Sequence, residues 1–361
     1  MNKRHFLLSV CIFMPLLLLL AGCGEDDTES EAAGNPADVV YVYNWGDYVD
    51  PDVLDMFEEE TGIKVYLDEF DTNEDMYPKI ASGASEYDVV CPSDYMIAKM
   101  IENDLLQPLD YDQLPLATEY IGEEFMKQAE AFDPGNRYTI PYAWGTVGIM
   151  YNKTLVDDPV ESWDILWDPK YKDEILMQDS VRDAFMVALR RLGYSLNTTD
   201  PDQLEEAKQL LIEQKPLVQA YVIDEARDKL VSCESAMGVV FSGEALWMIL
   251  ANEDLVYTVP EEGTNLWIDG WVITKNARHT ENAHKFIDFM CRPDVAALNC
   301  EYLTYSTPNT GAREYIEDED VLNSEELFPD LDEISYLESY SYLGEDMDKL
   351  YSELWIQMKS S

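Results

Sequence analysis

Residues 40–65 read VYVYNWGDYVDPDVLDMFEEETGIKV and predict a strand, a helix and a second strand in that order. The apolar and aromatic run at 39–45 is typical of a strand. Asp50–Pro51 then supplies a helix cap and a proline suited to the first turn, and Gly62 ends the helix. Residues 63–70 form the second expected strand. This order of elements predicts an α/β fold.

The same alternation continues along the chain. A helix over 73–82, a short strand over 87–92 and a helix over 93–103 complete a βαβαβ unit, which favours a mostly parallel sheet flanked by helices. After Tyr138 a second set of similar elements follows: Ile175–Met177, helix Arg182–Leu192, helix Pro201–Gln214, Ala236–Phe241 and helix Gly243–Ala251. Two α/β domains are therefore expected, in line with 361 residues.

Composition excludes some classes of function. The chain carries 73 Asp and Glu against 24 Lys and Arg, a net charge of −49, so it would repel phosphate backbones. We therefore predict no nucleic-acid binding. Aromatic residues make up 12% and hydrophobic residues 47% of the sequence, which favours a folded protein over an acidic disordered one.

The N-terminus has the pattern of an export signal. Lys3 and Arg4 precede a mainly apolar stretch from Phe6 to Ala21, and Leu20-Ala21-Gly22-Cys23 resembles the bacterial lipobox. We predict a signal peptide at 1–22, lipidation of Cys23, and a lipidated N-terminus with a flexible acidic linker at 23–38. Ordinary signal cleavage and an uncleaved anchor are the alternatives.

Few residues support catalysis or metal binding. Four cysteines follow Cys23 without CxxC spacing, and both a Cys291–Cys300 disulfide and free buried thiols are compatible with the sequence. His279 and His284 do not share a helix face, and we expect both on the surface. Neither a metal site nor a cofactor is predicted.

The familiar catalytic motifs are missing. GxSxG, HExxH, Walker A and GxGxxG do not occur, and Gly145-Thr146-Val147-Gly148 is expected to be a turn. Residues 71–82 begin like an EF-hand loop, but Met76 and Ser82 stand where glycine and glutamate are needed. A paired-carboxylate glycosidase remains open, since 73 acids give many accidental pairs.

Aromatic and acidic residues coincide where ligands are expected. Trp45-Gly46-Asp47-Tyr48 follows the first strand, and Ser93-Asp94-Tyr95 follows the third, at the carboxyl ends where open α/β sheets bind ligands. In the extended segment 266–270, Trp267 and Asp269 point to one side. Rings suit methylene chains and ammonium groups, and carboxylates accept charge-assisted hydrogen bonds. These features indicate an organic polycation, although core packing also explains aromatic residues at strand ends.

At these residues the chain resembles the spermidine/putrescine-binding proteins of polyamine ABC importers, members of the type II periplasmic-binding-protein fold. The resemblance spans nearly the whole mature chain. Besides residues 40–65, it rests on YDVVCPSDYMIAKM at 87–100, IPYAWGTVGIMYN at 140–152, LRRLGYSLNTTDP at 189–201, LWIDGWVIT at 266–274 and YSTPN at 305–309.

The resemblance implies two lobes, each a mostly parallel sheet flanked by helices, with ligand held in the cleft between them. It places lobe 1 at 39–142 plus 272–305 and lobe 2 at 143–271 plus 306–361. The implied ligand-binding residues are Trp45, Asp47, Tyr48, Ser93, Tyr95, Asp183, Phe241, Trp267, Asp269 and Tyr305. Phe241 stands where some members have Trp, so the choice between spermidine and putrescine stays open, and Ser341 is suspected near the cleft.

The expected protein is a monomeric, extracytoplasmic solute-binding subunit without enzymatic activity. Its expected partners are a polyamine ligand, the permease subunits of an ABC transporter and, through the lipid on Cys23, the membrane. We expect it at the outer face of the cell membrane or in the periplasm. Two alternatives remain. The same fold could bind an amino acid, a sugar or ferric ion, or the chain could be an exported acidic hydrolase.

Overall fold

The computed structural model describes residues 38–84, 86–331 and 333–361. The predicted signal peptide, Cys23 and the linker up to residue 37 lie outside these residues. Among the described residues, no helix is long and apolar enough to cross a membrane.

The first βαβαβ unit is present. It consists of β1 (Val39–Trp45), α1 (Pro51–Thr61), β2 (Lys64–Phe70), α2 (Asn73–Ala81), β3 (Val89–Val90) and α3 (Asp94–Glu102). The Asp50 side chain accepts a hydrogen bond from Asp52 N, and Gly62 ends α1 with a φ of 72°, as their sequence pattern predicted. β3 is shorter than predicted because only two of its residues pair with β1.

The remaining elements extend this sheet and cover it. In chain order they are β4 (Leu106–Gln107), α4 (Pro115–Tyr120), α5 (Glu123–Ala129), β5 (Thr139–Asn152), β6 (Ile175–Gln178), α6 (Val181–Arg191), α7 (Pro201–Gln214), β7 (Val218–Val222), α8 (Glu225–Val231), β8 (Met237–Phe241), α9 (Ser242–Ala251), β9 (Leu255–Thr258), β10 (Thr264–Thr274), α10 (Thr280–Met290), α11 (Pro293–Leu303), α12 (Glu319–Leu322), β11 (Leu337–Glu338) and α13 (Glu345–Ser360). Short 3-10 turns lie at Tyr111–Gln113, Trp163–Trp167, Pro169–Tyr171, Lys215–Leu217 and Ala312–Glu314.

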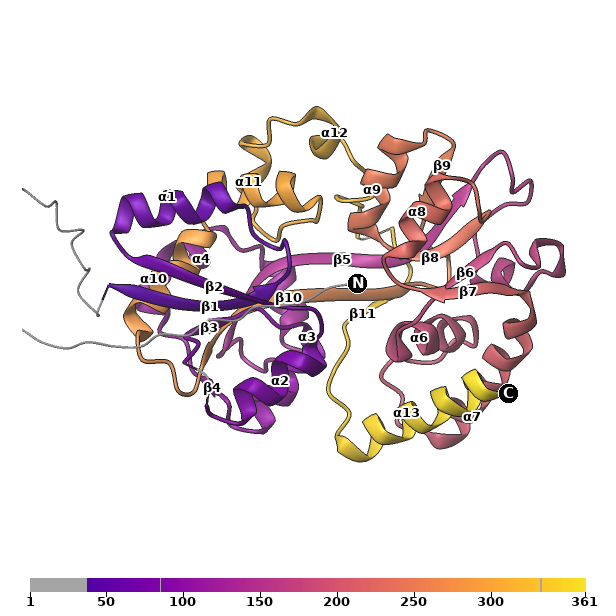
Figure 1. Ribbon diagram of the computed structural model, residues 1–361, viewed down its shortest axis with the longest axis horizontal. Coiled ribbons are helices and arrows are strands. Elements are labelled where there is room, and N and C mark those ends of the chain that lie inside the picture. The colour runs from indigo at the N-terminus through magenta and orange to yellow at the C-terminus, as the bar shows by residue number, and fades with distance from the viewer. Residues whose placement is uncertain (1–37, 85, 332) are drawn as a thin grey trace, which may run out of the picture. The chain divides into compact units, whose positions relative to one another are not determined.

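Two long strands join two parallel groups. The main strand order is β2-β1-β3-β10-β5-β8-β6-β7, in which β10 and β5 pair antiparallel with each other. The groups β2-β1-β3 and β8-β6-β7 are parallel. Figure 1 shows β5 and β10 running side by side from the first group to the second. The predicted α/β fold class with two lobes is confirmed, whereas the exact lobe borders stay a prediction.

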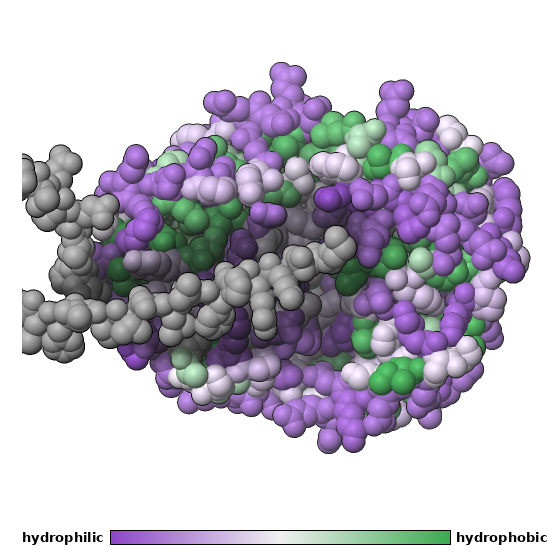
Figure 2. Space-filling view, viewed as in Figure 1, coloured by the Kyte–Doolittle hydropathy of each residue, from purple (hydrophilic) through white to green (hydrophobic). Residues whose placement is uncertain are grey.

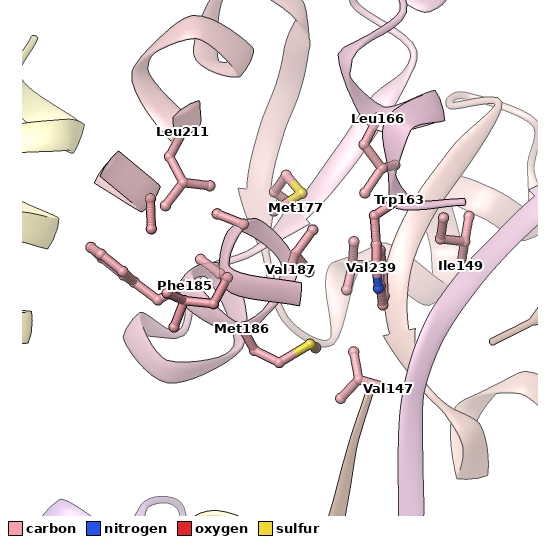
Figure 3. Close-up of a cluster of buried hydrophobic side chains, with 14 of the residues drawn as sticks. Val147, Ile149, Trp163, Leu166, Met177, Phe185, Met186, Val187, Leu211 and Val239 are labelled. Atoms are coloured by element: carbon pink, nitrogen blue, oxygen red, sulfur yellow. The ribbon is translucent and has the colours of Figure 1, made fainter. Parts of the chain in front are cut away.

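Each group has its own hydrophobic core. In the second group, α6 packs Phe185, Met186 and Val187 against Met177 of β6 and Val239 of β8 (Figure 3). These side chains are fully or almost fully buried, and each contributes about 1.5–3 kcal/mol on burial. The cores therefore hold the strand ends that carry the candidate site in place. The face shown in Figure 2 is mostly hydrophilic, as the high content of acids requires.

The expectation that both histidines lie on the surface is wrong. His284 is 1% exposed, and its Nε2 accepts a hydrogen bond from Asp110 N at 2.9 Å. His279 is half-buried and its Nδ1 lies 2.9 Å from Oδ2 of the buried Asp88. Both imidazoles satisfy polar groups inside the first lobe, which allows their burial.

The predicted turn at Gly145–Gly148 is also wrong, because both glycines lie within β5. A Cβ at Gly145 would collide with the ring of Trp267 on the neighbouring strand. Gly145 therefore leaves the space that the Trp267 ring occupies beside the candidate site. Of the two cysteine alternatives, the structure has free buried thiols at Cys291 and Cys300.

Candidate functional site

Five predicted aromatic side chains form a continuous series of ring contacts. Trp45 ends β1, Tyr48 follows it, and their ring centroids are 6.5 Å apart. Tyr48 lies 5.9 Å from Tyr305, which lies 5.3 Å from Trp267. Phe241, the last residue of β8, is 6.3 Å from Trp267. Residues that are up to 260 positions apart in sequence thus form one set of ring contacts, which we call the ring series.

Gly243 makes room for the centre of this series. A Cβ at this position would overlap the ring of Tyr305, whose neighbour Thr304 donates a hydrogen bond from Oγ1 to Gly243 O at 3.2 Å. The Tyr305 hydroxyl hydrogen bonds to Glu244. The start of α9 therefore fixes the position of Tyr305 relative to β10.

Asp269 is buried against this series. It lies on β10 two residues after Trp267 and is 7% exposed. The Tyr48 hydroxyl donates a hydrogen bond to Asp269 Oδ2 at 2.9 Å, and the Ser93 side chain also hydrogen bonds to the carboxyl group. Burial raises the pKa of Asp269 to about 6, while the hydrogen bonds from Ser93 and Tyr48 oppose that shift.

Asp183 belongs to a second acidic group. It is the third residue of α6, and its Oδ1 accepts a hydrogen bond from the Tyr340 hydroxyl at 3.0 Å. Ser180 caps the helix by accepting from Asp183 N at 3.4 Å. Burial raises the pKa of Asp183, whereas the hydrogen bonds and the charge of Arg182 oppose the shift. The helix N-terminus also favours the carboxylate.

Sequence reasoning missed Asp94 as part of this second group. Asp94 is 0% exposed, and its Oδ2 accepts a hydrogen bond from Tyr340 N at 3.2 Å. Burial raises its pKa well above the usual range, and the charge of Asp269 raises it further. Its position between Ser93 and Tyr95 was the available signal. Tyr340 lies outside the segments that carry the family resemblance, the last of which ends at residue 309, so no motif pointed to it.

Two predicted residues lie at the margin of this arrangement. Asp47 is exposed, has a φ of 51°, and within the described chain takes no part in the contacts that join the ring series. The Tyr95 hydroxyl donates to Glu74 Oε1 and accepts from Asn73 Nδ2, both at 3.1 Å. The backbone N of Tyr95 donates to Asp94 Oδ1 at 2.6 Å.

A small pocket lies next to the ring series. Tyr305 is the one predicted site residue that lines it, together with Tyr142, Trp271, Cys291 and Cys300 among others. Tyr142 donates from its hydroxyl to Tyr48 O at 3.0 Å, so a residue that lines this pocket also holds the backbone of Tyr48.

The acids of the site form no direct ion pair within the described residues, although the charge of Arg182 lowers the pKa of Asp94 and of Asp183. Among the ion pairs of the described residues, none includes Asp269, Asp94 or Asp183. No group of His, Cys, Asp or Glu in this part of the chain could hold a metal ion. Buried carboxylates beside aromatic rings can instead bind an organic cation through hydrogen bonds and cation–π attraction.

Comparison with known proteins identifies close relatives of the chain. The spermidine/putrescine-binding periplasmic protein of Salmonella typhimurium is 37% identical over 335 residues, covering 92% of this chain and 94% of the relative. The putrescine-binding periplasmic protein SpuD of Pseudomonas aeruginosa is 31% identical, with coverage of 96% and 98%.

A solved structure agrees with these relatives. The spermidine/putrescine ABC transporter substrate-binding protein PotD of Streptococcus pneumoniae matches with a TM-score of 0.81 and 45% identity, covering 90% of this chain and 99% of that one. The family model of bacterial extracellular solute-binding proteins matches residues 52–329. The chain therefore belongs to the family of bacterial extracellular solute-binding proteins.

Proposed function

We propose that this protein is the extracytoplasmic polyamine-binding subunit of an ABC importer. It binds spermidine or putrescine between its two lobes and delivers the polyamine to the permease subunits in the membrane. Relatives named for spermidine and putrescine binding, at 37% and 31% identity over most of the chain, support this assignment. No bond is made or broken in this function, so the protein has no enzymatic activity.

The burial of the Asp269 carboxylate is the observation that carries the proposal. A buried carboxylate that ionises only above about pH 6 carries a desolvation penalty in the ligand-free protein. An alkylammonium group has a pKa close to that of lysine, near 10.4, and therefore remains charged at neutral pH. Its binding at Asp269 offsets the penalty by pairing the buried charge.

The ring series suits the rest of such a ligand. The rings of Trp45, Tyr48 and Trp267 offer apolar surface for methylene groups and π faces for the ammonium groups. Each cation–π contact contributes about 0.5–2 kcal/mol, depending on how far it is desolvated. Asp183 would receive a second ammonium group. These roles extend to Asp47, Ser93, Tyr95, Phe241 and Tyr305 as proposed contacts.

Ligand binding would favour the closed arrangement of the lobes. The proposed lobes are 39–142 plus 272–305 and 143–271 plus 306–361, joined by β5, β10 and the segment after Tyr305. A polyamine that touches both lobes stabilises the closed state by its differential affinity for that state. The permease would recognise this closed form, and a lipid on Cys23 would keep the monomeric protein at the membrane.

Calorimetric titration of the purified protein tests the proposal. Putrescine, spermidine and spermine are compared with an amino acid, a sugar and ferric ion. We expect saturable binding of at least one polyamine and of none of the other solutes. Binding of another solute in place of the polyamines would refute the assignment.

A further inference from the structure

Asp94 links two parts of the chain that are far apart in sequence. It is the first residue of α3, and no part of it is exposed. One carboxylate oxygen accepts from Tyr95 N at 2.6 Å, and the other accepts from Tyr340 N at 3.2 Å. Helix α3 is thereby joined to the segment that precedes the C-terminal helix.

Tyr340 contacts both Asp94 and Asp183. Its backbone N bonds to Asp94, while its hydroxyl bonds to Asp183 Oδ1 at 3.0 Å. Its ring is 5% exposed and lies beneath the Arg182 guanidinium, whose carbon is 4.5 Å from the ring centroid. Tyr340 is therefore held by its backbone at Asp94 and by its side chain at Asp183 and Arg182, and its hydroxyl bonds to the carboxylate proposed to bind an ammonium group.

A second contact further along α3 joins this helix to the C-terminal helix α13. Lys99 Nζ lies 3.7 Å from Asp348 Oδ2 and 5.3 Å from the centroid of the Tyr342 ring. The chain from Tyr340 to Asp348 thus follows α3 from its first residue to its second turn. Asp94 makes the contact at the N-terminal end of α3, near the candidate site, where the charge of Asp269 raises its pKa further.

We propose that Asp94 is a positioning residue that fixes Asp183 for its ammonium group by holding Tyr340, an inference that rests on the proposed polyamine-binding function. Asp94 is fully buried and each of its oxygens accepts a backbone N–H group, so we infer that it acts without touching the ligand. Loss of this hydrogen bond leaves the backbone of Tyr340 free to move relative to α3, and this movement shifts the hydroxyl that bonds to Asp183. Asp94 therefore slows ligand release.

Asparagine is the informative replacement at position 94. Its side chain has the shape of aspartate but only one acceptor oxygen, so it cannot accept from both Tyr95 N and Tyr340 N. The segment around Tyr340 then loses its hydrogen bond to α3. We expect Asp94→Asn to raise the dissociation rate of the polyamine about tenfold, with a smaller effect on the association rate.

A double-mutant cycle identifies the route of the effect. Dissociation rates of the polyamine that binds most tightly are measured by stopped flow for the wild type, Asp94→Asn, Tyr340→Phe and the double variant. Because both substitutions interrupt one chain of hydrogen bonds, we expect the double variant to release ligand no faster than the more affected single variant. Tyr340→Phe also keeps the inference testable if Asp94→Asn does not fold.

Asp52→Asn is the matched control. Asp52 is likewise an acid in the first turn of a helix, but it is exposed, and we expect this variant to release ligand at the wild-type rate. An unchanged rate in Asp94→Asn, or additive effects in the double variant, would overturn the inference while the wild type still binds polyamine. A wild type that binds no polyamine would instead refute the proposed function itself, and this inference with it.

Discussion

Asp269 and Asp183 are both buried acids proposed to bind ammonium groups, but their surroundings differ. Asp269 lies in the middle of β10, where side-chain hydrogen bonds from Tyr48 and Ser93 oppose the rise in its pKa that burial causes. Asp183 lies at the start of α6, where the helix N-terminus and Arg182 also favour its charge. A carboxylate whose charge the protein leaves poorly compensated has more to gain from a cation. Asp269 is therefore expected to dominate binding.

The largest effect is expected from Asp269→Asn. The substitution removes the charge but keeps an oxygen that can accept the hydrogen bond from the Tyr48 hydroxyl. An ammonium group buried without its partner loses about 3 kcal/mol, or more than a hundredfold in affinity. Calorimetry measures the loss, and circular dichroism checks that the fold is retained. Wild-type affinity in this variant would remove the central contact from the proposed function.

Asp183→Asn is expected to weaken binding less, by about 1.5 kcal/mol or roughly tenfold. Arg182 and the start of α6 partly balance the Asp183 charge in the free protein, so less is gained when a ligand pairs with it. The same calorimetric titration compares the two variants. A loss as large as that of Asp269→Asn would show that the two acids are equivalent and break the comparison.

Lower pH is expected to reproduce part of the Asp269→Asn effect. With a pKa of about 6, Asp269 is mostly protonated at pH 5, whereas the ligand keeps its charge, so affinity falls about tenfold between pH 7.5 and pH 5. The Asp269→Asn variant is the control and should show a weaker pH dependence over this range. An equal dependence in both proteins would assign the titration to other groups.

The raised pKa of Asp269 also makes stability depend on pH, but here the protein gains stability, rather than losing affinity, as the pH falls. The folded-state pKa of Asp269 lies above its unfolded value of about 3.9, so its contribution to the free energy of unfolding is greatest below pH 4 and is lost as pH rises through about 6. The loss amounts to about 3 kcal/mol. Denaturant unfolding of ligand-free protein measures it as the difference between the wild type and Asp269→Asn at pH 4 and pH 7.5. A difference that does not change with pH would contradict the shift.

The smallest effect is expected from Tyr48→Phe. Removing the hydroxyl takes one hydrogen bond from Asp269, which raises the pKa of this carboxyl group further and leaves the ring in place. The affinity should fall only severalfold, by about 1 kcal/mol. Tyr66→Phe, at an exposed position on β2, is the control in calorimetry. A loss greater than that of Asp183→Asn would mean that Tyr48 contacts the ligand through its hydroxyl.

Most of the fold could be predicted because its signals are local. The helix cap at Asp50, the end of the helix at Gly62 and the alternation of strands and helices need only neighbouring residues. The two glycines at 145 and 148 could not be assigned correctly. Their function is to leave space for side chains of adjacent strands, including Trp267, and the sequence does not reveal that proximity.

The sequence suggested candidate site residues where strand ends and family motifs coincide, as at Trp45, Trp267 and Asp269. This prediction was incomplete where contacts join segments that are far apart in sequence. Asp94 and Tyr340 are 246 residues apart and meet through one hydrogen bond. The burial of His284 likewise depends on a backbone donor at Asp110, 174 residues away.

The sequence by itself determined most of the secondary structure, the α/β fold class and the supply of rings and acids, because periodicity and capping are properties of short segments. Only the tertiary structure decided which of the 73 acids lose water and which rings touch. Burial and charge compensation depend on neighbours that packing brings together, and these neighbours make Asp269 and Asp183 different sites.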